Sequence, residues 1–342
     1  MCVRKKPFFV PFIVLLTLGL PMAGAARKPL RTDRMKAEEV STGPAVMWND
    51  PTDLKSRDLF YGPGGKEHAP KGNFTFVEED REGGSPKFVV RDDEGRKWKA
   101  KLGLEARPET VCTRLLWAVG YYANDDYFVR DLKVVGMPAK LHRGQEFVDA
   151  DGSVHNVRLK RKDKTEDKKI GIWRWRHDAF TGTRELNGLR VLMAVINNWD
   201  LKDDNNAIYQ AGPERIYMVS DLGASFGWAG RTWPPAKGKD NLESYSKSKF
   251  IRRLTADSVD FAVPARPMWK FWVDPPEMIR RIHLEWIGKN VPRADAKWIG
   301  QLLARLSPQQ IRDAFRAGGY SPEETEQFAK LLEGRISVLT DL

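Results

Sequence analysis

The stretch Val195-Ile-Asn-Asn-Trp-Asp200-Leu-Lys-Asp-Asp-Asn205-Asn-Ala-Ile-Tyr209 decides the fold, together with Ile216-Tyr-Met-Val-Ser-Asp221-Leu-Gly223 shortly after it. The apolar run over 186–196 predicts a helix that leads into an Asp/Asn-rich loop, and two strands joined by a turn follow. Such a hairpin holds the two acidic loops side by side. Carboxylate and amide oxygens suit Mg²⁺, which usually also binds substrate phosphates. The stretch therefore predicts a site for a hard cation and for phosphate groups.

These loops carry a specific resemblance. Asp200-Leu-Lys202-Asp-Asp-Asn205 resembles the D-L-K-x-x-N core of a protein-kinase catalytic loop, and Asp221-Leu-Gly223 resembles the metal-binding D-F-G. The order Asn198-x-Asp200-x-x-x-x-Asn205 is similar to the loop of HipA-type and phosphoinositide-type atypical kinases. Protein kinases carry His-Arg where this chain has Asn198-Trp199, which favours the atypical branch. Without the resemblance, both stretches are simply turns rich in Asn and Asp.

The resemblance implies an α+β, two-lobed kinase-like fold over about residues 60–340 and a phosphotransferase that uses ATP and Mg²⁺. It implies that Asp200 orients the acceptor hydroxyl and that Lys202 lies near the transferred phosphate. Asn205 and Asp221 would then hold the metal. The acceptor stays open among protein, lipid, sugar and small molecule.

Residues 61–140 are expected to form the β-rich N-lobe with one helix. Alternating apolar residues and Gly-bearing turns predict strands over 74–77, 87–90 and 97–102. A helix over 108–120 follows, because Pro and Glu open it and Gly stops it. Residues 126–135 resemble one or two further strands.

A strand lysine and a helix glutamate complete the expected nucleotide site. Lys101 is preferred to Lys99 as the lysine on the α/β phosphates, because Lys101 lies nearer the strand end that feeds the helix. Glu109, at the start of that helix, is its expected partner. Backbone N–H groups of the turn Gly83-Gly84-Ser85 would cover the phosphates.

Residues 141–342 are expected to form the helical C-lobe, with a β insert over 141–182. In that insert, Trp173 and Trp175 alternate with arginines, which predicts a half-buried strand rather than a stacking surface for nucleic acid or sugar. The segment 228–249 is rich in Gly, Pro, Lys and Ser and reads as a loop. Caps and apolar stripes predict helices over 277–289, 293–305, 308–317 and 322–339.

The N-terminus predicts export. A basic start, an apolar run over 7–20 and the Ala23-Gly-Ala25 site describe a signal peptide over 1–25, with an uncleaved membrane anchor as the alternative. Residues 26–60 are polar and aperiodic, which predicts an extended linker. No second long apolar run follows, so the mature chain is not expected to span a membrane.

Composition limits the classes of partner. The net charge of +11 falls to +8 once the predicted signal peptide is removed, a mild bias toward anionic partners such as nucleotides. Specific nucleic-acid binding is not expected, because the basic residues form no one-faced stripe. Cys112 is alone in the mature chain, so no internal disulfide can form. The five histidines lack ligand spacing, so zinc is not expected.

Two other functions remain open. Gly223-Ala-Ser225-Phe-Gly227 fits the nucleophile elbow of serine hydrolases, and a triad with His283 can be assembled. The segment that follows contains Pro234-Pro235 and cannot form the regular helix that this elbow needs. Export takes the chain away from cytoplasmic ATP, which favours a catalytically silent pseudokinase or binding module in the cell envelope.

Overall fold

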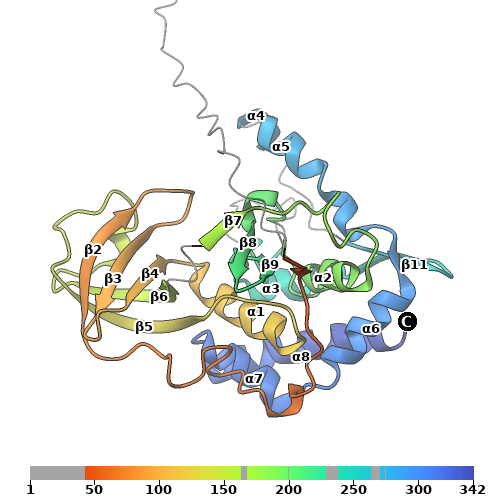
Figure 1. Ribbon diagram of the computed structural model, residues 1–342, viewed down its shortest axis with the longest axis horizontal. Coiled ribbons are helices and arrows are strands. Elements are labelled where there is room, and N and C mark those ends of the chain that lie inside the picture. The colour runs from red at the N-terminus through yellow and green to blue at the C-terminus, as the bar shows by residue number, and fades with distance from the viewer. Residues whose placement is uncertain (1–42, 163–167, 199, 229–237, 263–269, 274) are drawn as a thin grey trace, which may run out of the picture. The chain divides into compact units, whose positions relative to one another are not determined.

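The computed structural model describes residues 43–162, 168–198, 200–228, 238–262, 270–273 and 275–342 (Figure 1). The predicted signal peptide and the first part of the predicted linker lie outside these residues. A β-barrel and a mainly helical lobe with two small sheets make up the described chain. The expected α+β, two-lobed architecture is confirmed. No helix among the described residues is both long enough and apolar enough to cross a membrane.

The barrel is formed by five strands that close on themselves in the order β2-β3-β4-β6-β5. Side chains alternate along β4, so Trp98, Ala100 and Leu102 fill the barrel while the intervening lysines face outward. The barrel has its own core, separate from that of the helical lobe. Its strands are β2 Phe74–Asp80, β3 Lys87–Asp92, β4 Lys97–Leu102, β5 Asp126–Val135 and β6 Ser153–Lys162.

The helix α1, Ala106–Ala118, packs into the core of the helical lobe. It follows β4 directly through Gly103, whose φ of 86° is a backbone conformation that favours glycine. Val111 and Leu115 are buried among residues of the helical lobe, and α1 contacts α7. The sequence grouped this helix with the N-lobe, whereas its apolar face belongs to the larger core.

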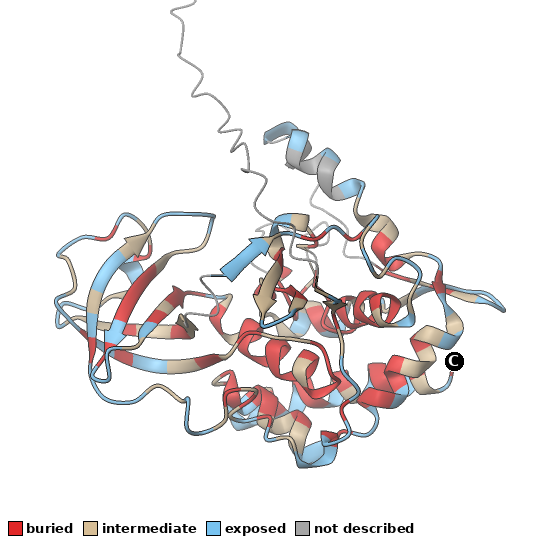
Figure 2. Cartoon of the chain, in the orientation of Figure 1, coloured by how far each residue is buried: buried red, intermediate tan, exposed pale blue. Residues whose placement is uncertain are grey.

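The helical lobe is built on amphipathic helices whose buried faces meet in one core (Figure 2). Capping boxes start two of them, at Ser307 with Gln310 and at Ser321 with Glu324. The long helices are α2 Arg184–Val195, α6 Arg293–Leu303, α7 Pro308–Ala317 and α8 Pro322–Thr340. The short ones are α3 Leu242–Ser246, α4 Lys270–Val273 and α5 Pro275–Ile282.

Two sheets flank these helices. The expected hairpin after α2 forms as β8 and β9, with β1 parallel to β9 and β7 beside β8. Isolated 3₁₀ turns cover Leu54–Ser56, Gln145–Phe147, Asp203–Asn205 and Glu285–Gly288. The strands are β1 Ala45–Val46, β7 Lys169–Gly171, β8 Asn206–Ala211, β9 Glu214–Val219, β10 Ile251–Leu254, β11 Ser258–Phe261 and β12 Val291–Pro292.

Three segments differ from the sequence-based expectation. The described part of the predicted linker packs on the helical lobe, where Met47 and Leu54 are buried. Strand β6 closes the barrel, whereas the sequence grouped it with the second lobe. Trp173 and Trp175 point inward as expected, but residues 172–177 form no strand. The structures of all three segments depend on contacts with residues far away in the sequence, which local sequence patterns do not reveal.

Candidate active site

Lys101 is surrounded by three carboxylates. It is the penultimate residue of β4, and only 3% of its side chain is exposed. Its Nζ lies 2.7 Å from Glu105, 2.9 Å from Glu109 and 3.1 Å from Asp221. Burial disfavours the charged ammonium, but the carboxylates outweigh this and raise the pKa of Lys101 above its usual range. The lysine therefore stays charged and ties the barrel to the helical lobe.

Glu109 holds Lys101 from the first turn of α1. The sharp turn after β4 brings this carboxylate to the lysine despite their short separation in sequence. Its other oxygen accepts from Arg158 Nη2 at 2.8 Å, so both oxygens of this buried group bind cations. Lys99 instead pairs with Asp80 at 2.9 Å. Of the two candidate lysines, the structure places Lys101 beside the glutamate.

Glu105 is the site residue that the sequence analysis missed. It precedes α1 and accepts from the Ser85 hydroxyl at 2.7 Å, while its second oxygen binds Lys239. Burial opposes its ionisation, but the charges of Lys101 and Lys239 hold its pKa well below the usual range. A lone acidic residue before a helix is common, and its spacing of four from Lys101 is the only signal for this contact.

Gly223, the last residue of the Asp-x-Gly motif, allows Glu105 and Asp221 to share Lys101. A Cβ at this position would lie 2.6 Å from the Glu105 Cβ and 3.1 Å from the Lys101 Nζ. Its backbone N–H donates to the Asp221 carboxylate at 3.2 Å. A side chain at Gly223 would therefore push the two lobes apart at the site.

The hairpin joins the two acidic loops. The backbone carbonyl of Asn205 accepts from the backbone N–H groups of Ser220 at 2.8 Å and Asp221 at 3.3 Å. The Asn205 side-chain amide donates to the Asp200 carbonyl at 2.7 Å. Because the amide nitrogen is used in this way, the Oδ1 atom of Asn205 is the end that can act as a ligand. Backbone and amide hydrogen bonds thus hold the segments of Asp200, Asn205 and Asp221 together, and a cation shared by their side-chain oxygens stays a prediction.

Asp200 and Lys202 lie together at the start of this cluster. Lys202 Nζ is 3.4 Å from a carboxylate oxygen of Asp200. The Asp200 N–H donates to the side chain of Asn198, which is buried and fixes the loop. Through this hydrogen bond Asn198 shapes the backbone at Asp200.

The side chains available to coordinate a cation suit Mg²⁺, which keeps water and phosphate ligands, better than they suit a metal coordinated only by protein atoms. Asp221 and Asn205 offer a carboxylate and an amide oxygen, and the Asp221 side chain is 40% exposed. The described residues contain no cluster of three or more His, Cys, Asp or Glu able to hold a metal. A cation here would complete its shell with water and phosphate oxygens, as Mg²⁺ does.

The predicted glycine turn is only partly connected to the site. Ser85 reaches Glu105, as described above, and the carbonyl of Gly83 accepts from Arg143. Gly84 is exposed, and a Cβ there would meet nothing within 4 Å. Among the described residues, neither glycine contacts Lys101 or Asp221, so phosphate covering by this turn stays a prediction.

Ser225 does not fit the hydrolase alternative. It is fully buried, and its hydroxyl donates to the Leu222 carbonyl at 2.7 Å. An acyl-transfer nucleophile needs an exposed hydroxyl beside a base. Its geometry is that of a residue packed beneath the Asp-x-Gly turn.

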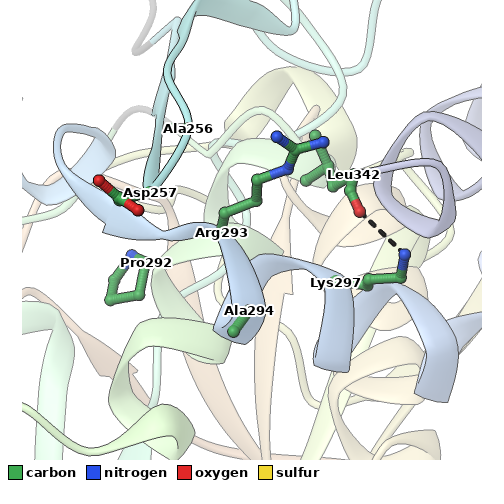
Figure 3. A pocket seen from close by; sticks show the side chains of 7 residues that line it. All are labelled: Ala256, Asp257, Pro292, Arg293, Ala294, Lys297 and Leu342. Carbon is green, nitrogen blue, oxygen red and sulfur yellow. Dashed lines mark hydrogen bonds between the residues drawn. The ribbon is translucent and has the colours of Figure 1, made fainter.

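A pocket of about 320 Å³ lies away from this site, at the start of α6 (Figure 3). Lys297 donates to the Leu342 carbonyl there at 2.9 Å. None of its lining residues contacts the Lys101 cluster. They are Ala256, Asp257, Pro292, Arg293, Ala294, Lys297 and Leu342.

Comparison with known proteins gives distant likenesses. No protein-family model matches the sequence, and no curated protein matches it. Among solved structures, the chain is similar to the Helicobacter pylori proinflammatory kinase CtkA, with 10% identity, a TM-score of 0.45, and coverage of 80% of this chain and 98% of that one. It is also similar to the Golgi casein kinase, with 11% identity, a TM-score of 0.35, and coverage of 80% and 71%. At this low sequence identity, the function has to be inferred from the site residues themselves.

Proposed function

We propose that this protein is a kinase-like phosphotransferase that uses Mg·ATP to phosphorylate a hydroxyl group. The observation that carries the proposal is the buried Lys101–Glu109 ion pair with Asp221 beside it. A rigid ammonium next to a carboxylate that can take a metal is what positioning of a nucleotide's phosphates requires. The cluster of Asp200, Asn205 and Asp221 supplies the remaining groups within one hairpin.

Each residue of the site has a chemical role in the proposed reaction. Lys101 would bind the α/β phosphates, and Asn205 and Asp221 would hold Mg²⁺, which when bound would supply positive charge next to the transferred group. The acceptor oxygen forms a bond to the γ-phosphorus while the bond from that phosphorus to the β–γ bridging oxygen breaks. The acceptor's proton passes to Asp200, and ADP leaves. Lys202 offsets negative charge on the group in transit.

Binding is tested first, by thermal-shift and calorimetric titration of the purified protein with Mg·ATP. We expect Asp221→Asn to lose most of the Mg²⁺-dependent part of the affinity. Asp204→Asn is the matched control, because it removes from the same loop a carboxylate whose charge acts on Lys169 and not on the Lys101 cluster. Equal Mg·ATP affinity in wild type and Asp221→Asn would remove Asp221 from the metal site.

Transfer is tested by autophosphorylation with radiolabelled ATP. We expect Asp200→Ala to lower the rate by about 10²–10⁴-fold, the usual contribution of a positioned acid–base group. Nucleotide affinity should change little, because Asp200 acts on the acceptor. A rate equal to wild type would contradict the role of Asp200.

A catalytically silent nucleotide-binding module is the second candidate. The observation that favours it is the lysine itself, whose ammonium already has three carboxylate partners. Export through a signal peptide, which we also propose, would place the protein where ATP is scarce. Under this candidate Mg·ATP binds, and no label is transferred by wild type or by Asp200→Ala.

A further inference from the structure

Three rows of cations cross the outer face of the barrel beside the site. The register of β4 and β6 sets Lys97 opposite Lys162 and Lys99 opposite Lys160. The third row sets Lys101 opposite Arg158. Directly opposed residues lie on the same face of a sheet, so all six charges share one surface.

The neighbouring elements add to this charge. Strand β3 brings Lys87 opposite Lys101 and Arg91 opposite Lys97 on the same face. Lys169 approaches from β7 in the sheet of the helical lobe. Burial and then the charge of Lys160 lower the pKa of Lys169, the Asp204 carboxylate opposes this change, and Lys99 lowers the pKa further. We call Lys97, Lys99, Lys160, Lys162 and Lys169 the lysine face.

Among the described residues, carboxylates are found at the inner end of these rows, and Asp204 lies near Lys169. Lys101 and Arg158 are neutralised at the active site, as described above. Asp80 lies 2.9 Å from Lys99 and 3.8 Å from Lys87. Within the described part of the chain, no carboxylate forms an ion pair with Lys97, Lys162 or Lys169. Like charges opposite each other destabilise a sheet, so an anion bound across such a row would stabilise it.

The spacing of the rows suits a ligand with several anionic groups. Residues two apart on a strand are separated by about 7 Å, so the row of Lys99 and the row of Lys97 lie about 7 and 14 Å from the row of Lys101. Because lysine side chains are long and flexible, those of neighbouring rows can converge on a ligand that carries several phosphates. The face is continuous with the phosphate lysine, so a molecule held there can present a hydroxyl to the same site.

We propose that the lysine face binds phosphate groups of the acceptor, so that the substrate is a phosphate-bearing molecule. This inference rests on the proposed phosphotransferase function. The same chemistry could come from the nucleotide's own phosphates, and the two sources differ in one respect. An acceptor site stays available when Mg·ATP is bound, whereas a nucleotide site does not.

Inorganic tripolyphosphate is the probe, titrated by calorimetry into the full chain with and without saturating Mg·ATP. The test variant is Lys97→Gln/Lys162→Gln/Lys169→Gln. The control, Lys55→Gln/Lys71→Gln/Lys330→Gln, removes the same net charge from exposed lysines elsewhere. We expect wild type to bind the probe in the presence of Mg·ATP, the test variant to bind it at least tenfold more weakly, and the control to stay within threefold.

Three results would overturn the inference: displacement of the probe by Mg·ATP, unchanged affinity in the test variant, or an equal loss in the control. Loss in the control would mean that only the overall charge matters. Failure of the proposed function can be distinguished from failure of this inference. If the protein binds tripolyphosphate on the lysine face but neither binds Mg·ATP nor transfers label, the anion site stands and the phosphotransferase does not.

Discussion

At the scale of single residues, the site is organised by competition for one ammonium group. Lys101 has three donor hydrogens, and Glu105, Glu109 and Asp221 each lie within 3.1 Å of its nitrogen. Glu109 is buried and fixed by Arg158, whereas Asp221 is partly exposed. Glu105 is held from outside the ion pair by Ser85 and Lys239. A phosphate oxygen that binds Lys101 must therefore replace Glu105 or Asp221, and Asp221 is the one for which we propose a role in holding the metal.

The first prediction concerns Glu105→Gln. The change keeps the shape of the side chain and removes a negative charge beside the expected phosphates. We expect Mg·ATP to bind roughly tenfold more tightly, equivalent to about 1.4 kcal/mol. Calorimetric titration measures this directly. Weaker binding would instead make Glu105 a ligand of the metal.

Glu109→Gln is the contrasting variant at the same lysine. Glu109 is 1% exposed and pairs with both Lys101 and Arg158, so removing its charge leaves buried cations without a counter-charge. Breaking such a buried pair destabilises a fold by about 3–5 kcal/mol. We expect a large fall in the free energy of unfolding by urea, which Glu105→Gln should not share.

The second prediction concerns the pH dependence of His155. Its ring nitrogens lie 2.6 Å from Asp131 and 2.7 Å from Asp149, and hydrogen bonds to Asp149 and then Asp131 raise its pKa above 6.5. Because the pKa is raised on folding, this contact stabilises the fold fully below pH 6.5. The stabilisation is lost as the pH rises through the folded pKa.

An NMR titration of the His155 ring checks this. We expect Asp149→Asn to move the pKa back toward 6.5. Asp151→Asn is the control, because Asp151 bonds Ser153 and not the imidazole. Equal pKa values in wild type and Asp149→Asn would mean that the ring does not bind Asp149 in solution.

At the scale of elements, sequence patterns predicted the helices and strands whose formation depends on residues close together in the chain. Alternation gave β4 over 97–102, and capping residues gave the starts of α7 and α8. Lys101 and Glu109 were predictable because a strand, a tight turn and a helix bring neighbours in sequence together. Glu105 was not, because its partners Ser85 and Lys239 come from distant segments. The position of β6 in the barrel depends on pairing with β4 and β5, which no local pattern encodes.

The third prediction compares Gly300, at the contact of α6 and α8, with Gly334, on the exposed side of α8. A Cβ on Gly300 would lie 2.5 Å from the Leu339 Cβ and 3.0 Å from its carbonyl carbon. We expect Gly300→Ala to cost about 1–3 kcal/mol, because neither backbone can move aside freely. A Cβ on Gly334, in α8, would meet nothing within 4 Å. Gly334→Ala should stabilise by about 0.5–1 kcal/mol.

Urea unfolding of both variants gives the comparison. Opposite signs would show that the close approach of α6 and α8 sets the cost at Gly300. If Gly300→Ala stabilised the protein as much as Gly334→Ala, the two helices would not be in contact as described.

At the scale of the whole molecule, the site is the junction of two unequal cores. The core of the helical lobe extends through α1, α2, α6, α7 and α8, while the barrel encloses a smaller one. Charged and polar contacts bridge the two, with Lys101 on the barrel and Glu109 and Asp221 on the other side. Sequence reasoning found both lobes and grouped α1 with the first, whereas the apolar face of α1 lies in the core of the second and the helix also contacts β5 and β6 of the barrel. The apolar stripe of that helix predicts that one face is buried, but it does not identify the elements that cover this face.

The last prediction follows from this division. Local stability tracks buried apolar contact, so amides of β3 and β4 should exchange with solvent through openings of lower free energy than those of α2 and α8. Lys101→Met removes the ammonium that binds carboxylates of the other core. It should therefore raise exchange in the barrel and leave α8 nearly unchanged, while bound Mg·ATP should slow exchange in the wild-type barrel. Hydrogen exchange followed by mass spectrometry resolves these segments. Equal acceleration in α8 and the barrel would mean that both cores open as one unit, and that Lys101 stabilises the whole fold rather than the junction.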